Sequence, residues 1–530
     1  MKTTYDYIVV GGGSAGCVLA ARLSENPQAE VLLIEAGKRD SNPYIHIPAG
    51  FAKMTTGPLT WGLETVPQRH ARDRVIPMAQ GKVLGGGSSI NAQVFTRGHP
   101  TDYDRWASSE GCPGWSFAEI QRYFLRAEGN SVLSGDWHGT DGPLSVSNLP
   151  SPHPLSLRFV QACQEYGMPY NPDFNRAEQA GASIYQTTSR SGQRCSTARG
   201  YLKPVLSRPN LTLRTSAEVR RLIVKSGRVT GIELADVTYR AEAEVLLCAG
   251  GLGSARLLML SGIGPADHLR DVGVNVVHDL PGVGSALQDH FVIDIICQLK
   301  DTETLNRYDK PHWMAWAGLQ WALFGTGPAT SNVAEGGAFW RSSQTTDVPD
   351  LQFHFLPGVG AEAGVTGLSS GVGATLNAYF VRPLSRGSLR LRSADPQDKP
   401  LLDPNYLAEP GDVAGSIDAV EVSREIMRQP AFTDVMKAEV EPGAKATSRA
   451  DLEDYVRQNG RTGYHPVGTC RMGSDDMAVV SPDLRLRGLD GLRVCDSSVM
   501  PSIVGSNTNA PTVMIAERAA DLVRGNRIPA

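Results

Sequence analysis

Three glycines close to the N-terminus, in the pattern Gly11-x-Gly13-x-x-Gly16, constrain the fold of this chain more than any other feature. Residues 7–10 before them form a short apolar run, and residues 15–23 have the periodicity of a helix. Glycines at such a turn allow a tight bend, a close approach of backbone to a pyrophosphate, and close packing of helix on strand. The pattern predicts a dinucleotide-binding turn; a glycine turn that only packs is the alternative.

An acidic residue at the end of the next apolar run supports this interpretation. Residues 31–34 end at Glu35, about 20 residues beyond the glycines, where a carboxylate can accept hydrogen bonds from ribose hydroxyls. Residues 12–16 also satisfy GxSxG, the turn that presents a hydrolase nucleophile, which would make Ser14 catalytic. Such a turn normally follows several strands and would leave Glu35 without a role, so the serine hydrolase is kept only as an alternative.

Two later passages repeat the strand-and-helix character of the N-terminus. Residues 245–250 predict a strand with a helix at 254–260, and residues 492–496 predict a strand before a C-terminal helix at 511–523. We therefore expect three fragments of one nucleotide-binding sheet at the start, middle and end of the chain. Residues 211–234 are interpreted as an antiparallel insert with a turn at 226–227.

The region from residue 291 to about residue 460 has a different character. It predicts strands at 351–355, 376–381 and 388–392 and helices at 418–427 and 451–457. The fold class is therefore α/β, or α+β overall: a discontinuous Rossmann-like nucleotide-binding domain with an inserted sheet-plus-helix domain. The expected limits are 1–155, 196–290 and 461–530 for the first domain, and 156–195 and 291–460 for the second.

Composition excludes several classes of protein. The formal net charge of −4 gives no field that would attract nucleic acid, so nucleic acid is not an expected partner. The eight cysteines are scattered with no CxxC, so neither a disulfide framework nor a metal site is expected. The N-terminal residues do not form a signal peptide, and no apolar run reaches the roughly 18 residues of a membrane span. These observations predict a cytoplasmic protein.

Residues 81–91 hold a second glycine cluster, Gly-Lys-Val-Leu-Gly-Gly-Gly-Ser-Ser-Ile-Asn. It is either a second anion-binding nest, a close approach of backbone to a flat ring, or an ordinary loop. Here the chain resembles the glucose–methanol–choline (GMC) oxidoreductases, FAD enzymes that oxidise alcohols. Residues 81–91 match the first family signature and residues 250–264 the second, with Ala255 where proline is usual. Residues 464–473 and 507–512 resemble the choline dehydrogenase and bacterial medium-chain alcohol dehydrogenase branch.

The resemblance implies FAD, and it makes the first domain the FAD-binding domain and the second the substrate domain. It places Gly11, Gly13, Gly16 and Glu35 on the ADP half, Val83, Gly86, Asn91 and Ala92 by the pyrophosphate and flavin ring, Val219 by the adenine, and Asp496 near the ribityl chain. The other residues expected to bind FAD are Ser14, Ala15, Ala36, Trp61, Gly81, Val94, Ala249, Gly250, Asn507 and Thr508. Some relatives attach FAD to a histidine at the position of Ile90, so non-covalent FAD is predicted here.

Alcohol oxidation needs a base for the hydroxyl proton, and histidine suits that role because its pKa lies near neutrality. His465, in the matched segment 464–473, is the candidate base. The resemblance pairs it with a second histidine or an asparagine, which is Asn507 here. Asn507 would donate a hydrogen bond to the substrate oxygen. Asn509 is the reserve candidate, with holding the backbone before Pro511 as its other role.

The expected reaction is oxidation of a primary aliphatic or aromatic alcohol to the aldehyde. Choline is the alternative substrate, because Glu335 falls where choline-oxidising relatives carry a carboxylate, and a non-catalytic flavin-binding protein is the alternative of another class. The electron acceptor, whether oxygen, a quinone or another compound, has no motif. Residues 310–325 carry Trp313, Trp316 and Trp321, and could roof a substrate tunnel, touch the inner membrane peripherally, or form a buried helix.

Overall fold

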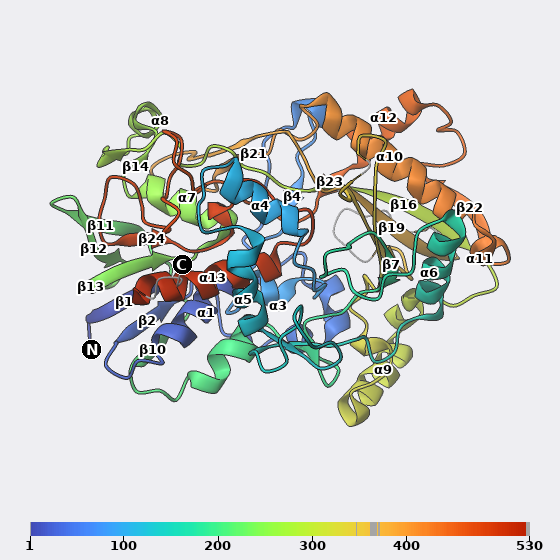
Figure 1. The fold of residues 1–530 in the computed structure, drawn as a ribbon, viewed down its shortest axis with the longest axis horizontal. Coiled ribbons are helices and arrows are strands. Elements are labelled where there is room, and N and C mark those ends of the chain that lie inside the picture. The colour runs from blue at the N-terminus through green and yellow to red at the C-terminus, as the bar shows by residue number, and fades with distance from the viewer. Residues whose placement is uncertain (1, 346, 361–367, 369–370, 526–530) are drawn as a thin grey trace.

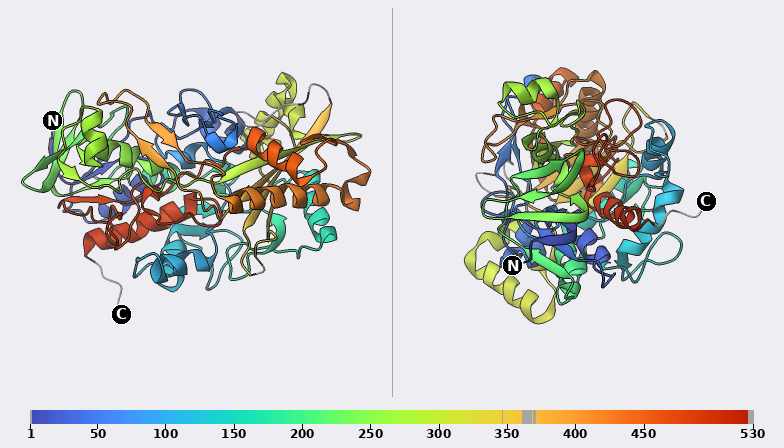
Figure 2. Two further views of the ribbon diagram at one scale, coloured as in Figure 1. Left: turned by 90° about the horizontal axis from the view of Figure 1, so that it is seen from above. Right: turned by 90° about the vertical axis from the view of Figure 1, so that its left-hand side faces the viewer.

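The computed structural model describes residues 2–345, 347–360, 368 and 371–525, and shows an elongated molecule with two large sheets side by side along its long axis (Figure 1). The first sheet lies near both ends of the chain, and the second lies beneath α10 (Pro410–Met427) and α12 (Arg449–Asn459). The view from above in Figure 2 shows the same two halves.

The first sheet confirms the predicted strand–helix–strand unit. β1 (Thr4–Val10) pairs in parallel with β2 (Val31–Ile34) on one side and with β13 (Thr238–Leu247) on the other. All four residues of β2 are buried, as is usual for a parallel strand covered on both faces. α1 (Ser14–Leu23) begins directly after the glycine turn and packs on this sheet.

The predicted fragments from the middle and the end of the chain join the same layer. β24 (Leu492–Val494) pairs in parallel with β13, and α7 (Gly250–Leu260) follows β13 directly. α13 (Asn509–Arg524), drawn in red, packs against α1 (Figure 1). The Rossmann-like layer is therefore discontinuous in sequence, as predicted.

The interpretation of residues 211–234 as an antiparallel insert is partly wrong. β10 (Leu211–Arg214) pairs in parallel with β2 and forms the edge of the first sheet. Only β11 (Arg221–Lys225) and β12 (Arg228–Glu233) form an antiparallel hairpin, and β12 continues onto β13. A strand of four residues carries no local signal of its distant partner, so its direction of pairing was not readable.

The second sheet is antiparallel throughout, in the order β22-β16-β19-β18-β17-β7, with β23 also paired to β16. The predicted strands at 351–355 and 376–381 appear in it as longer strands, and the predicted helices at 418–427 and 451–457 belong to α10 and α12. Sequence analysis missed β16, because its side chains are almost all buried and show no alternation. The strands are β7 (Gly181–Ile184), β16 (Phe291–Leu299), β17 (Gly336–Trp340), β18 (Leu351–Leu356), β19 (Val372–Phe380), β22 (Met436–Glu441) and β23 (Arg461–Thr462).

The expected domain limits stay a prediction, although strand pairing bears on them at two points. β7 comes from the predicted segment 156–195 and joins the second sheet. β23 begins at residue 461, in the segment assigned to the first domain, yet it pairs with β16 of the second sheet.

α9 (Pro311–Phe324) contains the tryptophan-rich segment and projects from the lower edge of the molecule (Figure 1). Ala317 is its one buried residue, and Trp316 and Phe324 are 57% and 71% exposed. The buried-helix alternative is therefore wrong. Among the described residues, no helix has the length and apolar character needed to cross a bilayer.

Shorter elements complete the described chain. The remaining α-helices are α2 (Pro43–His46), α3 (Gly87–Ile90), α4 (Pro100–Ser108), α5 (Phe117–Ala127), α6 (Pro154–Tyr166), α8 (Ala266–Asp271) and α11 (Pro430–Thr433). The remaining strands are β3 (Leu63–Glu64), β4 (Pro77–Met78), β5 (Glu128–Asn130), β6 (Leu144–Val146), β8 (Ser189–Arg190), β9 (Gln193–Arg194), β14 (Ile263–Gly264), β15 (His278–Asp279), β20 (Ser388–Arg390) and β21 (Leu401–Asp403).

Candidate active site

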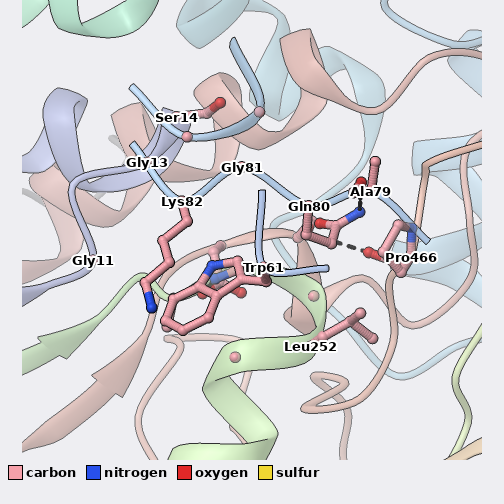
Figure 3. Close-up of a pocket in the computed structure, with 18 of the residues that line it drawn as sticks. Gly11, Gly13, Ser14, Trp61, Ala79, Gln80, Gly81, Lys82, Leu252 and Pro466 are labelled. Carbon is pink, nitrogen blue, oxygen red and sulfur yellow. Dashed lines mark hydrogen bonds between the residues drawn. The ribbon is translucent and has the colours of Figure 1, made fainter. Parts of the chain in front are cut away.

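A cavity of about 440 Å³ is lined by residues of both sheets and of the loops between them. Its wall includes the glycine turn after β1 and His354 of β18. Figure 3 shows one part of this wall, where the Lys82 side chain lies over Trp61 beside the segment Ala79–Gly81, with its ammonium nitrogen 4.0 Å from the ring centroid.

Most of the residues predicted to bind a cofactor or substrate line this one cavity. Gly16 and Val83 do not: Gly16 packs α1 on β1, and the Val83 side chain is buried with Ile45, Met54 and Ile90. The predicted residues in the wall are Gly11, Gly13, Ser14, Ala15, Glu35, Ala36, Trp61, Gly81, Gly86, Asn91, Ala92, Val94, Val219, Ala249, Gly250, His465, Asp496, Asn507 and Thr508.

The glycine turn needs glycine for two local reasons. Gly11 has a φ of +100°, and a Cβ atom there would lie 2.4 Å from the Cys248 carbonyl oxygen at the end of β13. A Cβ atom on Gly16 would lie 1.9 Å from the Gly11 carbonyl oxygen. The close approach of α1 to β1, and hence the position of the helix N-terminus at the cavity, depends on both.

The Glu35 carboxylate is held at the cavity by backbone amides. Its Oε2 accepts a hydrogen bond from the Gly12 amide at 2.8 Å and its Oε1 accepts one from the Gly37 amide at 2.6 Å. Each oxygen retains a further lone pair for a ligand hydroxyl. Burial raises the pKa of Glu35 to about 7, since the two amide hydrogen bonds offset only part of the cost of desolvating the charge.

Asp496 lies at the same cavity, just beyond the end of β24 and after Cys495. Its Oδ2 accepts hydrogen bonds from the Gly250 amide and the Ser254 hydroxyl, and its Oδ1 accepts one from the Ser498 amide. Burial raises its pKa. These contacts tie the last strand fragment to the start of α7, so the carboxylate has a fixed position.

His465 and Asn507 are brought together although they are far apart in sequence. The Asn507 Nδ2 lies 3.2 Å from the His465 Nε2. The Asn507 Oδ1 accepts hydrogen bonds from the Thr96 hydroxyl at 3.1 Å and the Gln352 amide at 3.0 Å, so the Nδ2 end of the amide faces His465. Sequence analysis missed Thr96 and Gln352, because neither stands in a motif that marks its contact.

Two more histidines lie beside His465, and both were missed. His290 packs edge-on against it, with 2.9 Å between the two Nδ1 atoms, and His354 lines the cavity. Burial lowers the pKa of His465 well below its ordinary value, and the nearby His290 lowers it further because two positive imidazoles would repel each other. Burial also lowers the pKa values of His290 and His354 to about 3. All three imidazoles are therefore neutral at neutral pH.

The backbone of His465 is fixed by Asp289. The Asp289 Oδ1 accepts a hydrogen bond from the His465 amide at 2.7 Å, and its Oδ2 accepts from the hydroxyls of Tyr406 and Thr462, each at 2.5 Å. Burial raises the pKa of Asp289 to about 6. The neighbouring residues 289 and 290 thus contact the main chain and the side chain of His465, respectively.

Ser14 and the reserve candidate Asn509 contact each other. The Ser14 hydroxyl donates to the Asn509 Oδ1 at 2.9 Å rather than to a histidine. Asn509 therefore links the C-terminal segment to the glycine turn through its side chain, which differs from the backbone role predicted for it. Ser14 has no activating base in this contact, and the geometry does not favour a hydrolase nucleophile.

Glu335 faces away from the cavity. Its side chain is fully buried and accepts hydrogen bonds from the Ser331 hydroxyl, the Ser156 hydroxyl and the His153 amide, at 2.6 to 2.7 Å. Its neighbour Ala334 lines the cavity and Glu335 does not. These contacts tie the carboxylate to neighbouring protein groups and favour a structural role for it.

Comparison with known proteins decides the family. Models described as GMC oxidoreductase match residues 5–292 and 383–516. The chain belongs to the GMC oxidoreductase family. The two matched segments of this GMC oxidoreductase include the glycine turn, both glycine-rich signatures, His465 and Asn507.

Relatives with known activity match over nearly the whole chain. An alcohol dehydrogenase [acceptor] of Pseudomonas putida is 42% identical, covering 98% of this chain and 95% of that protein. An oxygen-dependent choline dehydrogenase of Sinorhizobium fredii is 40% identical, covering 98% and 96%. A formate oxidase of Aspergillus oryzae, solved to study its FAD modification, superposes with a TM-score of 0.93 at 25% identity, covering 99% and 98%. The protein is an oxidoreductase rather than a hydrolase.

FAD is the cofactor of this GMC oxidoreductase, and the cavity suits it. The wall offers the glycine turn at a helix N-terminus for phosphates and Glu35 for ribose hydroxyls. It also includes Gln93, a fully buried residue whose side-chain nitrogen and oxygen have no hydrogen-bond partner in the described part of the chain. Buried polar atoms are normally satisfied, so these two are free to meet a bound group.

Proposed function

We propose that this protein oxidises uncharged primary alcohols to aldehydes, with His465 as the base and Asn507 as the orienting group. The observation that carries the proposal is the His465–Asn507 pair, two nitrogens 3.2 Å apart at the wall of the same cavity that Glu35 and the glycine turn line. A hydroxyl oxygen that approaches both side chains can lose its proton to one and accept a hydrogen bond from the other.

The protein residues have separate tasks in this reaction. FAD, when bound, supplies the acceptor for the hydride removed from the alcohol carbon. The His465 Nε2 takes the hydroxyl proton, and burial keeps this imidazole in the neutral form that can accept one. The Asn507 Nδ2 donates to the oxygen as negative charge develops there, and Thr96 and Gln352 hold the amide in that orientation. The Gly11 and Gly86 turns, Glu35 and Asp496 are proposed to hold the cofactor.

The charges around the cavity favour an uncharged substrate over choline. Burying a quaternary ammonium carries a desolvation cost that a nearby carboxylate would offset. Glu335 is unavailable, because it is fully buried, is absent from the cavity wall, and accepts hydrogen bonds from Ser156, Ser331 and the His153 amide. The carboxylates in the described lining are Glu35, Glu218, Asp398 and Asp496, and the proposal assigns the first and the last of these to the cofactor.

A matched pair of substrates tests this proposal. Choline and 3,3-dimethylbutan-1-ol have the same shape, and only choline carries a charge. Bleaching of the flavin absorbance would be followed in the purified holoenzyme after anaerobic addition of each, together with hexan-1-ol and benzyl alcohol. We expect kcat/KM to be at least about 10-fold higher for the neutral isostere, equivalent to about 1.4 kcal/mol. A preference for choline would reverse the substrate assignment, and no bleaching by any alcohol would support the non-catalytic flavin protein.

The attachment of FAD is proposed to be non-covalent. Ile90, at the position where some relatives carry a histidine, lines the cavity and has no atom that can form a bond to the flavin. Acid precipitation of the protein should release the yellow colour into the supernatant. Colour that remains in the pellet would show a covalent link.

A separate proposal concerns α9, whose segment 311–324 contains no Asp, Glu, Lys or Arg. None of its residues lines the described cavity, so the tunnel-roof alternative has no support. The exposed apolar side chains of Trp316, Leu319, Leu323 and Phe324 suit contact with a lipid surface. The holoenzyme should co-sediment with vesicles of phosphatidylethanolamine and phosphatidylglycerol, and the double variant Trp316→Ser/Phe324→Ser should not. Equal sedimentation of the two proteins would reject the membrane contact.

A further inference from the structure

His290 contacts the candidate base without reaching the cavity. It lies directly before β16, is fully buried, and is absent from the cavity wall. Its ring stands at 88° to the ring of His465, with 5.1 Å between the centroids. Whatever His290 does for the reaction, it does through His465.

The position of the proton on His290 follows from its partners. Its Nε2 lies 3.1 Å from the Val381 carbonyl oxygen, and a carbonyl only accepts hydrogen bonds, so the Nε2 carries the hydrogen. Burial keeps the ring neutral, with a pKa of about 3, so the ring has a single N–H. The Nδ1 of His290 is therefore a bare lone pair.

That lone pair determines which nitrogen of His465 carries its proton. The two Nδ1 atoms are 2.9 Å apart, and a hydrogen bond between them needs one donor. Because the His290 Nδ1 accepts, the His465 Nδ1 must donate. A neutral His465 then has a bare Nε2, and this is the atom that faces the Asn507 Nδ2.

The other end of the network leads to the same assignment. The Asn507 Oδ1 is occupied by Thr96 and Gln352, so its Nδ2 is the donor towards His465. The donated hydrogens run in one direction, from Asn507 to His465, from His465 to His290, and from His290 to the Val381 carbonyl. This arrangement of protons on the neutral groups satisfies each of these contacts.

We propose that His290 is a positioning residue that holds His465 as the Nδ1-protonated tautomer and so directs its basic Nε2 to the cavity. The inference rests on the proposed role of His465 as the base. When the substrate O–H bond breaks and a new N–H bond forms at the Nε2, the resulting imidazolium still donates its Nδ1 hydrogen to His290. The tautomer and its acceptor are therefore in place before the proton moves.

Two substitutions separate positioning from simple packing. His290→Leu fills much of the space but has no acceptor, and His290→Asn places a carbonyl oxygen near the former Nδ1. In holoenzyme labelled with ¹⁵N-histidine, His465 should show a protonated Nδ1 and a bare Nε2 in the wild type and in His290→Asn. In His290→Leu we expect the Nε2–H form to appear and kcat to fall about 10- to 100-fold, with most of the loss recovered in His290→Asn.

Each outcome bears on the proposal. A wild-type spectrum with the proton on the His465 Nε2 would overturn it, even if the His290→Leu variant failed to fold. An unchanged tautomer in folded His290→Leu, or equal loss of kcat in the Leu and Asn variants, would also overturn it. Failure of the proposed function is a distinct result, because a His465→Ala variant would then reduce flavin at the wild-type rate whatever the spectrum showed.

Discussion

The two parts of the cavity that are proposed to bind nucleotide and substrate are built in different ways. The glycine turn and Glu35 come from one β1–α1–β2 unit, and backbone amides hold the Glu35 carboxylate. At the substrate part, Thr96, Gln352 and Asn507 come from three distant segments and hold one another through side chains. The comparison teaches that one local unit forms the proposed nucleotide site, whereas the amide of the proposed catalytic pair is oriented by Gln352 of the second sheet.

This difference predicts how far the effect of a substitution spreads. A change at Glu35 removes the acceptor of the Gly12 and Gly37 amides, but these contacts lie within one local unit, so the effect should stay in the nucleotide part. A change at Asn507 leaves the polar atoms of Thr96 and Gln352 without an acceptor, and a buried polar group without a partner costs about 1–3 kcal/mol.

The largest effect should follow removal of the base. His465→Ala should lower the rate of flavin reduction by about 10²- to 10⁴-fold, because the hydroxyl proton loses its acceptor. Bound FAD should be unchanged, since the nucleotide part of the cavity is built separately. His312→Ala, at an exposed position of α9, is the matched control and should keep the wild-type rate. Stopped-flow measurements at 450 nm would check this, and near wild-type reduction in His465→Ala would remove His465 from the mechanism.

A smaller loss is expected when the orienting amide is removed. Asn507→Ala should lower kcat by about 10²-fold, as for the loss of one donor to a developing oxyanion. Asn509→Ala is the matched control, because its side chain also lines the cavity but contacts Ser14. Steady-state kinetics with the best alcohol would rank the two variants. A greater loss of kcat in Asn509→Ala than in Asn507→Ala would show that Asn509 is the residue that orients the substrate.

The smallest effect is expected from a substitution at the nucleotide part of the cavity, and it should change only the affinity for FAD. Glu35→Gln should raise the Kd for FAD about 10-fold, or about 1.4 kcal/mol, with kcat unchanged at saturating FAD. Burial raises the pKa of Glu35 to about 7, so the carboxylate forms as pH rises through 7. Below that pH, the difference in FAD affinity between the wild type and Glu35→Gln should therefore shrink. Fluorescence titration of FAD into apoprotein would measure this. A Glu218→Gln control with the larger loss of affinity would contradict the role of Glu35.

Prediction from sequence succeeded where the signal is local. The run from residue 7 to Glu35 has a strand, a glycine turn, a helix and a second strand in succession, and each is found. It failed for β10, whose parallel partner is distant, and for β16, whose burial on both faces removes the alternation of apolar and polar residues. For the site, the matched motifs identified His465 and Asn507 as candidates but not the contacts that orient them.

What the sequence by itself determined is the chemistry available: a dinucleotide turn, an acidic residue after β2, a histidine and an asparagine in family motifs, and uncharged residues along α9. Only the tertiary structure decided how these groups are used. In the folded chain the Glu335 carboxylate accepts hydrogen bonds from Ser156 and Ser331, and His290 contacts His465 although the two are 175 residues apart in sequence. The physical reason is that hydrogen-bond direction and burial depend on neighbours in space, which a linear pattern does not contain.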